Sequence, residues 1–480
     1  MNIFYRPKNA WVGDCIPYWE DGCYYIFYLH DPRNVAGKYA ENTTWHLLTS
    51  PDLIKFEERG EAIERGAGNQ PNKNIYTGSI CRGKDGEYYA FYTAVNEALS
   101  VNGKIRQSIM YAKGETLFHL ATDESFILYA DDEIYESFDW RDPFVFWNDN
   151  DQQYWMLLAA RLKGAGGHRG GCIGLCTSKD LKIWNYQKPL YAPNMYITME
   201  CPEVFFQNGW WYMVFSTFSD RFVTHYRMAR NLLGPWTIPV DDVFDCRANY
   251  ALKTASDGKK RFSFGWIASK TGETDQGDWE WGGTMAIHEI KQNADGLFHT
   301  APPPALVSYY HHKREISAWI LFNAERIQTN KGVDFCTDTL GAALCKIPED
   351  NFAIDVELTV EGGTEYGIAL HTEPDMERGY FLRMDPASGL VAWDIWPRKE
   401  QGFYQWQIAG DKPYQMETCR RFIPQRTNHI QIIREREITV VYINGKTALS
   451  SPLYNFKGGY GGPYVIQGLV HIGDCTISTP

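Results

Sequence analysis

Three acidic residues stand in similar surroundings along the chain and could perform acid–base or nucleophilic chemistry. Asp14, Asp142 and Glu200 each lie among apolar or aromatic residues, and each is followed within three positions by a proline. An isolated ionised carboxylate is costly to bury, and carboxylates that converge repel one another, which raises the pKa of at least one of them. Glycoside hydrolysis needs such an arrangement, with one protonated acid for the leaving oxygen and one ionised carboxylate on the other face of the sugar.

The elements that must position these acids form a repeat. A turn, mostly of Asp-Gly or Asn-Gly type, leads into an aromatic-rich strand, and the copies of this hairpin pattern begin at Asp21, Asp85, Asp151, Asn208 and Asp257. Five repeats of three to four strands each predict an all-β fold that opens with a five-bladed β-propeller over residues 1–305. Asp14, Asp142 and Glu200 precede the first, third and fourth copies.

The shared position of the acids ahead of these hairpins points to a common pocket. The innermost strand of each propeller blade lines a central funnel, so residues at the start of that strand face a shared space. Taken singly, each acid could instead cap a turn or pair with a cation such as Arg6 or Arg141. The same register in several repeats favours the pocket for the three acids together.

A proline-rich segment separates the repeats from a second region. Residues 299–305 contain three consecutive prolines, which interrupt both helices and sheet ladders. Beyond them come short alternating strands such as Phe352–Val360 and Ile438–Ile443, the latter closed by an Asn-Gly turn. This pattern predicts a β-sandwich over residues 315–480, which could bind carbohydrate or pack on the propeller; we favour packing.

Composition and charge exclude several classes of partner. The 480 residues carry 47 Lys and Arg against 59 Asp and Glu, a net charge of −12, so we expect no nucleic-acid partner. The sequence shows neither a long apolar span nor a signal peptide at its start, which predicts no membrane contact and a cytoplasmic location. The 11 cysteines are expected to be reduced, and the closest pair has no histidine beside it, so we expect no metal and no cofactor. The oligomeric state stays open.

Other side chains could take part in binding. His30 with Asp31 forms either a functional pair near the funnel or a pair within a turn. Arg141 could hold a carboxylate or a hydroxyl of a ligand, or form a bridge inside the funnel. The indole rings proposed as platforms for apolar sugar faces, with core packing as the alternative for each, are Trp45, Trp266 and Trp281.

Several motifs together resemble glycoside hydrolase family 32. Residues 140–143 match its Arg-Asp-Pro motif, and residues 199–202 match its Glu-Cys-Pro motif, in the expected order and spacing. Residues 75–79 resemble a family segment that touches substrate, and residues 265–266 and 281–284 resemble motifs of its fifth blade. The similarity extends over nearly the whole chain.

The resemblance implies a fold and roles for single residues. Members of this family join a five-bladed propeller to a β-sandwich and cleave β-fructosides with retention. By resemblance, Asp14 is the nucleophile, Glu200 is the general acid and base, and Asp142 holds sugar hydroxyls and stabilises the transition state. Substrate contacts are implied for Tyr76, Thr77 and Ser79. A small carbohydrate is therefore the expected partner.

The first motif departs from the family pattern. Gly13 stands where the family has an asparagine before the acid, residues 15–17 replace Pro-Asn-Gly, and the segment 28–32 lacks a glutamine. These changes rebuild one wall of the sugar site and leave the substrate open beyond a terminal furanoside, with sucrose or short fructo-oligosaccharides favoured. The alternatives are an inverting arabinofuranosidase or xylosidase of family 43 type, and a sugar-binding protein without turnover.

Overall fold

The regular secondary structure of the described residues is almost entirely β-strand. The computed structural model describes residues 3–33, 42–101, 103–316, 318–327, 333–396 and 414–480. The described chain forms two compact units. Unit 1 comprises residues 1–244, 249–268 and 280–298, and unit 2 comprises residues 245–248, 269–279 and 299–480. Within the described residues, no helix is both long enough and apolar enough to cross a membrane.

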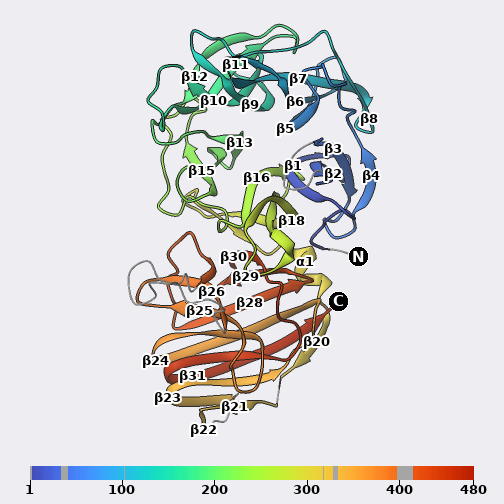
Figure 1. Cartoon of the computed structure of the whole chain (residues 1–480). Coiled ribbons are helices and arrows are strands. Elements are labelled where there is room, and N and C mark those ends of the chain that lie inside the picture. Colours follow the sequence, from blue (N-terminus) through green and yellow to red (C-terminus); the bar gives the residue numbers. More distant parts are fainter. Residues whose placement is uncertain (1–2, 34–41, 102, 317, 328–332, 397–413) are drawn as a thin grey trace. The chain divides into compact units, whose positions relative to one another are not determined.

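Unit 1 is built from four antiparallel sheets, which lie around a common centre in Figure 1. The largest has the order β16 (Asn249–Ser256), β17 (Arg261–Lys270), β18 (Trp279–Gln292), β1 (Trp11–Glu20), β2 (Cys23–Asp31), β3 (Thr44–Ser50), β4 (Glu57–Glu61). The second contains β5 (Asn74–Arg82), β6 (Tyr88–Val101), β7 (Lys104–Thr116) and β8 (His119–Thr122). The third contains β9 (Tyr135–Asn148), β10 (Gln153–Leu162), β11 (Gly171–Ser178) and β12 (Asn185–Tyr191). The fourth contains β13 (Glu200–Gln207), β14 (Trp210–Thr217) and β15 (Val223–Ala229).

The repeated hairpins are present at all five expected places. The pairs are β1–β2, β5–β6, β9–β10, β13–β14 and β16–β17. The first and fourth turns place Asp21 and Gly22, and Asn208 and Gly209, in the left-handed region, which matches the twist of the flanking strands. Because β18 pairs with β1, the first and fifth hairpins share one sheet, and the count of five blades stays a prediction.

A β-bulge interrupts the first strand of every hairpin. We call these five strands, β1, β5, β9, β13 and β16, the inner strands. Each gains one residue relative to its partner, at residues 12–15, 76–78, 141–144, 200–203 and 250–253. A bulge bends the strand and re-aims the side chains beside it, and bulges are common next to active sites. All three candidate acids lie within or directly beside such a bulge.

The aromatic residues of the repeats fill the space between neighbouring sheets. One buried cluster joins Tyr89, Phe91 and Tyr111 of the second sheet to Trp140 and Met156 of the third. Another joins Val204, Met213 and Phe215 of the fourth sheet to Leu157 and Ile173 of the third. Because each sheet packs against the next through such a cluster, the positions of the inner strands around the centre are fixed by core packing.

Unit 2 contains one 12-stranded sheet system. Its strands are β20 (His312–Glu315), β21 (Ile320–Phe322), β22 (Glu325–Ile327), β23 (Val333–Lys346), β24 (Phe352–Thr372), β25 (Gly379–Asp385), β26 (Leu390–Trp396), β27 (Tyr414–Glu417), β28 (Thr427–Glu435), β29 (Ile438–Ile443), β30 (Lys446–Pro452) and β31 (Tyr460–Thr479). Three further short elements are η1 (Thr271–Glu273), β19 (Phe298–Ala301) and α1 (Pro304–Tyr309). The helix starts at the third proline, where a missing N–H costs nothing. The predicted boundaries at residues 305 and 315 stay predictions.

Candidate active site

The three candidate acids meet in one pocket of unit 1. The pocket has a volume of about 740 Å³, and Asp14, Asp142 and Glu200 all line it. Tyr76, Tyr250 and Trp281 also line it, so residues on β1, β5, β9, β13, β16 and β18 contribute. The fold therefore brings together side chains that are up to 267 positions apart in the sequence, from Asp14 to Trp281.

Asp14 is held by hydrogen bonds at both carboxylate oxygens. The indole N–H of Trp266 donates to Oδ1 over 2.9 Å, and the thiol of Cys201 lies 3.7 Å from Oδ2. Burial, followed by the negative charge of Asp142, raises the pKa of Asp14 to about 7, although the Trp266 hydrogen bond and the charge of Lys253 act in the opposite direction. Asp14 therefore changes its protonation state near neutral pH.

Asp142 sits in a backbone conformation that only a well-fixed site retains. Its φ is +58°, in the left-handed region that non-glycine residues seldom adopt. The hydroxyl of Thr93 accepts from its backbone N–H over 2.8 Å, and its Oδ2 accepts from the backbone N–H of Cys201 over 2.9 Å. Burial raises the pKa of Asp142 to about 6, while the neighbouring Arg141 charge lowers it and that of Glu200 raises it.

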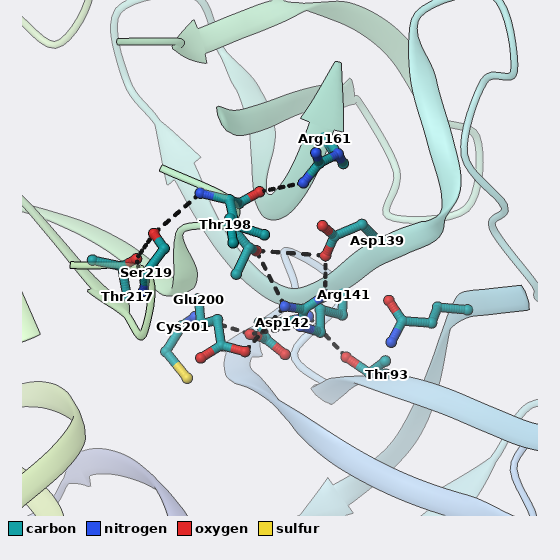
Figure 2. A network of polar contacts seen from close by, with 12 residues as sticks. Thr93, Asp139, Arg141, Asp142, Arg161, Thr198, Glu200, Cys201, Thr217 and Ser219 are labelled. Carbon is teal, nitrogen blue, oxygen red and sulfur yellow. Dashed lines mark hydrogen bonds and ion pairs between the residues drawn. The ribbon is translucent and has the colours of Figure 1, made fainter. Parts of the chain in front are cut away.

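Arg141 connects the acids of β9 to Glu200 (Figure 2). Its Nη2 donates to Glu200 Oε1 over 3.0 Å and to the Thr198 hydroxyl over 3.1 Å, and its Nη1 pairs with Asp139. Its Nε lies 3.8 Å from Oδ2 of Asp142. Of the two sequence hypotheses for Arg141, the structure shows the bridge, and the pocket still exposes the side chain to a ligand.

Glu200 receives a second hydrogen bond from a tyrosine. The hydroxyl of Tyr250 donates to Glu200 Oε2 over 2.7 Å, so each carboxylate oxygen has one donor. Burial and the adjacent Glu200 charge raise the pKa of Tyr250 far above its usual value, which keeps this hydroxyl protonated. Glu203, three positions along the same strand, is buried and bonds to Thr254 instead, in agreement with the structural role expected for it.

Two residues predicted to touch substrate, Thr77 and Ser79, are buried and form hydrogen bonds with other strands. Thr77 is 1% exposed, and its hydroxyl accepts from the buried ammonium of Lys253 over 3.0 Å. Ser79 accepts from the backbone N–H of Val145 over 2.9 Å and so joins β5 to β9. Tyr76, in contrast, lines the pocket. For Thr77 and Ser79 the expected substrate contact is corrected to a contact with another strand, β16 for Thr77 and β9 for Ser79.

The three tryptophans proposed as sugar platforms have different positions. Trp45 is fully buried, and its indole N–H donates to the carbonyl of Tyr76 over 2.9 Å, so it has no exposed face and the prediction was wrong. Trp266 is 1% exposed and acts on Asp14 through its N–H, so its ring is not a platform either. Trp281 lines the pocket and keeps this possibility.

His30 lies outside the group of residues that line the pocket in the described part of the chain. Its ring stacks on that of His46, with centroids 3.9 Å apart and planes 10° from parallel. Burial lowers the pKa of both rings, that of His46 to about 4. The neighbouring Asp31 pairs with Arg33 over 3.2 Å. The functional pairing of His30 and Asp31 near the acids is thus corrected to a stacked histidine pair in the sheet.

The indole ring of Trp281 packs directly against Gly13, in the place where a side chain at position 13 would lie. A Cβ on Gly13 would lie 2.2 Å from Cη2 of Trp281 and 2.9 Å from Cβ of Leu29, well inside contact distance. The indole of Trp281 therefore fills the volume that any larger residue before Asp14 would need. The departure at position 13 is coupled to the presence of a large ring in this pocket.

Sequence reasoning missed Lys253 and Tyr250. Both lie at the bulge of β16, the first strand of the fifth hairpin, at the place where the first, third and fourth hairpins carry their acids. The sequence hypothesis rested on acids alone, and a tyrosine and a lysine in the same register carry no such signal. Lys253 donates to Thr77 and Gly78, and its positive charge lowers the pKa of Asp14 and Asp142.

Comparison with protein families identifies the chain. The model for the "Glycosyl hydrolases family 32 N-terminal domain" matches residues 5–296, more than half of the sequence. The chain belongs to glycosyl hydrolase family 32. This assignment confirms the family resemblance that the motifs at residues 140–143 and 199–202 indicated.

Curated family 32 relatives match over part of their length. A levanbiose-producing levanase of Bacillus subtilis (strain 168) is 26% identical over 209 residues, which cover 42% of this chain and 36% of the levanase. An extracellular exo-inulinase of Aspergillus niger (strain ATCC MYA-4892 / CBS 513.88 / FGSC A1513) is 26% identical over 227 residues, covering 42% of this chain and 40% of the inulinase. The matched part of this chain thus spans well under half of either relative.

Solved family 32 structures share the fold along nearly the full chain. Sucrose-6-phosphate hydrolase from Lactobacillus gasseri gives a TM-score of 0.71 at 16% identity, covering 98% of this chain and 90% of that one. Exo-inulinase from Aspergillus awamori gives a TM-score of 0.71 at 17% identity, covering 99% of this chain and 97% of the inulinase. Fructan 1-exohydrolase IIa from Cichorium intybus, solved with 1-kestose, gives a TM-score of 0.71 at 14% identity, covering 99% of this chain and 96% of the exohydrolase.

Proposed function

We propose that this family 32 member is a β-fructofuranosidase-type hydrolase that removes terminal fructosyl units with retention. The observation that carries the proposal is the convergence of Asp14, Asp142 and Glu200 in one pocket, on strands that carry the family's motifs. The levanase and the exo-inulinase that it resembles act on fructans by name. We further propose that units 1 and 2 are a five-bladed propeller and a β-sandwich.

In the first half of the reaction, the Asp14 carboxylate attacks the anomeric carbon of the fructosyl group. The bond from that carbon to the leaving oxygen breaks, and its electron pair takes the proton of Glu200. The fructosyl–Asp14 ester and a free alcohol result. Trp266 orients the attacking carboxylate through its 2.9 Å hydrogen bond to Oδ1, and the Cys201 thiol lies 3.7 Å from Oδ2.

In the second half, water cleaves the ester. Glu200, now ionised, takes a proton from the water, whose oxygen attacks the anomeric carbon and releases Asp14. Two displacements at one carbon give net retention. Asp142, fixed by the N–H of Cys201, accepts from sugar hydroxyls and stabilises the positive charge that develops on the ring.

The proposal is tested by product release. Purified protein is incubated with sucrose, 1-kestose, levan oligosaccharides and nitrophenyl furanosides, and free monosaccharide is measured together with the anomer first formed. We expect fructose as the released sugar and the β-anomer as the first product. Release of arabinose or xylose instead, or an inverted anomer, would refute the proposed substrate or stereochemistry. A sugar-binding protein would give no release from any substrate, with wild type and Glu200→Ala indistinguishable.

A further inference from the structure

Large apolar side chains line the pocket together with its acids. Residues 218–222 connect β14 to β15, and Phe218 and Phe222, at its two ends, line the pocket while remaining 44% and 37% exposed. Phe138 and Ile105 line it as well. We call Phe138, Phe218, Phe222 and Ile105 the aromatic rim. Large apolar side chains exposed at the mouth of a polar pocket indicate a binding surface.

The aromatic rim is adjacent to Glu200. The ring of Phe222 stacks on that of Tyr250, with centroids 4.3 Å apart and planes 17° from parallel. The hydroxyl of the same tyrosine donates to Glu200 over 2.7 Å. Only the side chain of Tyr250 therefore separates Phe222 from the carboxyl group proposed to protonate the leaving oxygen, which places Phe222 on the leaving-group side.

Phe222 is held there by a strained backbone. Its φ is +56°, a left-handed conformation that is a genuine outlier for a bulky residue and persists only where the surroundings fix it. The neighbouring residues supply the fixation, because Asp220 lies 3.3 Å from Nε2 of the buried His225, and Arg221 pairs with Asp242 over 2.6 Å. Asp242 in turn accepts from the buried Arg227.

The polar residues near the rim are engaged with the protein. The side-chain oxygen of Gln107 accepts from the backbone N–H of Trp140 over 3.0 Å, and Glu97 pairs with Lys73 and accepts from Asn74. The ammonium of Lys104 lies 3.7 Å from the ring centre of Phe138. A leaving group beside the aromatic rim contacts phenylalanine rings and the side chain of Ile105. These groups offer apolar contact and few hydrogen bonds.

We propose that Phe218 and Phe222 form a leaving-group subsite for aglycones with a flat apolar face, so that aryl-type β-fructofuranosides are favoured substrates. The inference rests on the proposed function, because it takes Glu200 as the group beside the leaving oxygen. Burial of apolar area supplies the binding, and the pre-fixed loop avoids the entropy cost of ordering the rings at each encounter.

The test compares methyl and benzyl β-fructofuranoside, which share the glycone and differ in the leaving group. The kcat/KM ratio of benzyl to methyl is measured for wild type, Phe218→Ala, Phe222→Leu and the control Phe206→Ala, which alters an exposed phenylalanine outside the pocket. We expect wild type to favour benzyl by about tenfold or more, and the ratio to fall about five- to tenfold in both rim variants but not in the control. A wild-type ratio near one, or equal losses on both substrates, overturns the inference.

A binding experiment separates this inference from the proposed function. Glu200→Gln protein is titrated by calorimetry with both glycosides, and then the double variant with Phe218→Ala. We expect benzyl fructoside to bind about tenfold more tightly than methyl fructoside, and this advantage to be lost in the double variant. Absence of fructose release from every substrate refutes the hydrolase proposal alone. Equal affinity for both glycosides refutes the subsite alone.

Discussion

The floor and the rim of the pocket are built in opposite ways. The floor, which we define as Asp14, Asp142, Glu200 and Arg141, lies at the inner-strand bulges, and each of these side chains has a hydrogen-bond partner on another strand. Phe218 and Phe222 of the aromatic rim come from a connection between strands and keep their rings exposed. Rigid strands position the groups that need ångström-level geometry, whereas connections present the groups that choose a ligand.

The comparison predicts different consequences of substitution. A change in the floor removes a group whose charge is buried and whose partners are left unsatisfied, so it lowers turnover for every substrate. A change in the rim removes apolar area and alters the ranking of substrates. If a floor substitution changed selectivity alone, this division of roles would fail.

The largest effect is expected at the two acids proposed to form and break bonds. Asp14→Asn removes the nucleophile and Glu200→Gln removes the transferable proton, so each should lower kcat by about 10⁴-fold or more with all leaving groups. Initial rates with sucrose and benzyl β-fructofuranoside measure the effect.

Glu203→Gln is the matched control for these variants. Glu203 is a carboxyl on the same strand, β13, but it is buried, accepts from Thr254 and does not line the pocket. We expect this variant to lose stability by about 1–2 kcal/mol and to keep kcat within about threefold. A loss of kcat in Glu203→Gln equal to that in Glu200→Gln would contradict the assignment of Glu200.

A smaller loss is expected at Arg141. Arg141→Lys keeps the charge but cannot contact Asp139, Thr198 and Glu200 at once, so Glu200 loses its fixed orientation (Figure 2). We expect kcat to fall by about 10²-fold with little change in the benzyl-to-methyl ratio. Arg161→Lys is the control, because Arg161 is buried nearby and donates to the carbonyl of Ile197. A rate loss of the same size in Arg161→Lys would show that packing, and not contact with Glu200, decides the result.

The repeat and the acids could be predicted from sequence because both leave local signals. Turns mostly of Asp-Gly or Asn-Gly type mark the hairpins. An acid among aromatic residues before such a turn is a local signal, which Asp14, Asp142 and Glu200 share. The family motifs added their order. The blade count, the boundaries and the cytoplasmic location rest on features that local patterns do not fix, and they stay predictions.

The errors at the site come from side-chain direction. Trp45 and Trp281 have the same residue type and similar aromatic neighbours, yet one is in the core and the other lines the pocket. A bulge shifts the alternation of a strand by one residue, and its position cannot be read from composition. Thr77 likewise turns to Lys253, a contact made 176 residues further along the chain. Phe218 and Phe222 gave no repeat signal because they lie on a connection.

The contact between Gly13 and Trp281 bears on the comparison of floor and rim, because Gly13 precedes the floor acid Asp14 and Trp281 lines the pocket. Gly13→Ala should lower the free energy of unfolding by about 2–3 kcal/mol, because its Cβ would overlap the indole. In the background of Trp281→Ala the same change should cost much less, which gives a coupling of about 1 kcal/mol or more in a double-mutant cycle measured by urea unfolding. Additive effects would show that Leu29 or the backbone, and not Trp281, demands a glycine.

The smallest effect concerns the stability cost of the floor charges. The pKa of Asp14 is raised from 3.8 to about 7 in the folded protein, so the folded state binds its proton more tightly than the unfolded state. The resulting stabilisation is complete below pH 3.8 and is lost as the pH rises through about 7. Asp14→Asn removes this dependence. As the pH rises from 5 to 8, we expect the free energy of unfolding of the variant to increase by about 1–2 kcal/mol relative to that of wild type. This is less than the full pKa shift implies, because solvent reaches Asp14. Phe218→Ala, a rim change without charge, should show the same difference from wild type at both pH values. A pH-independent difference for Asp14→Asn would mean that its carboxylate is as well solvated in the folded protein as in the unfolded chain.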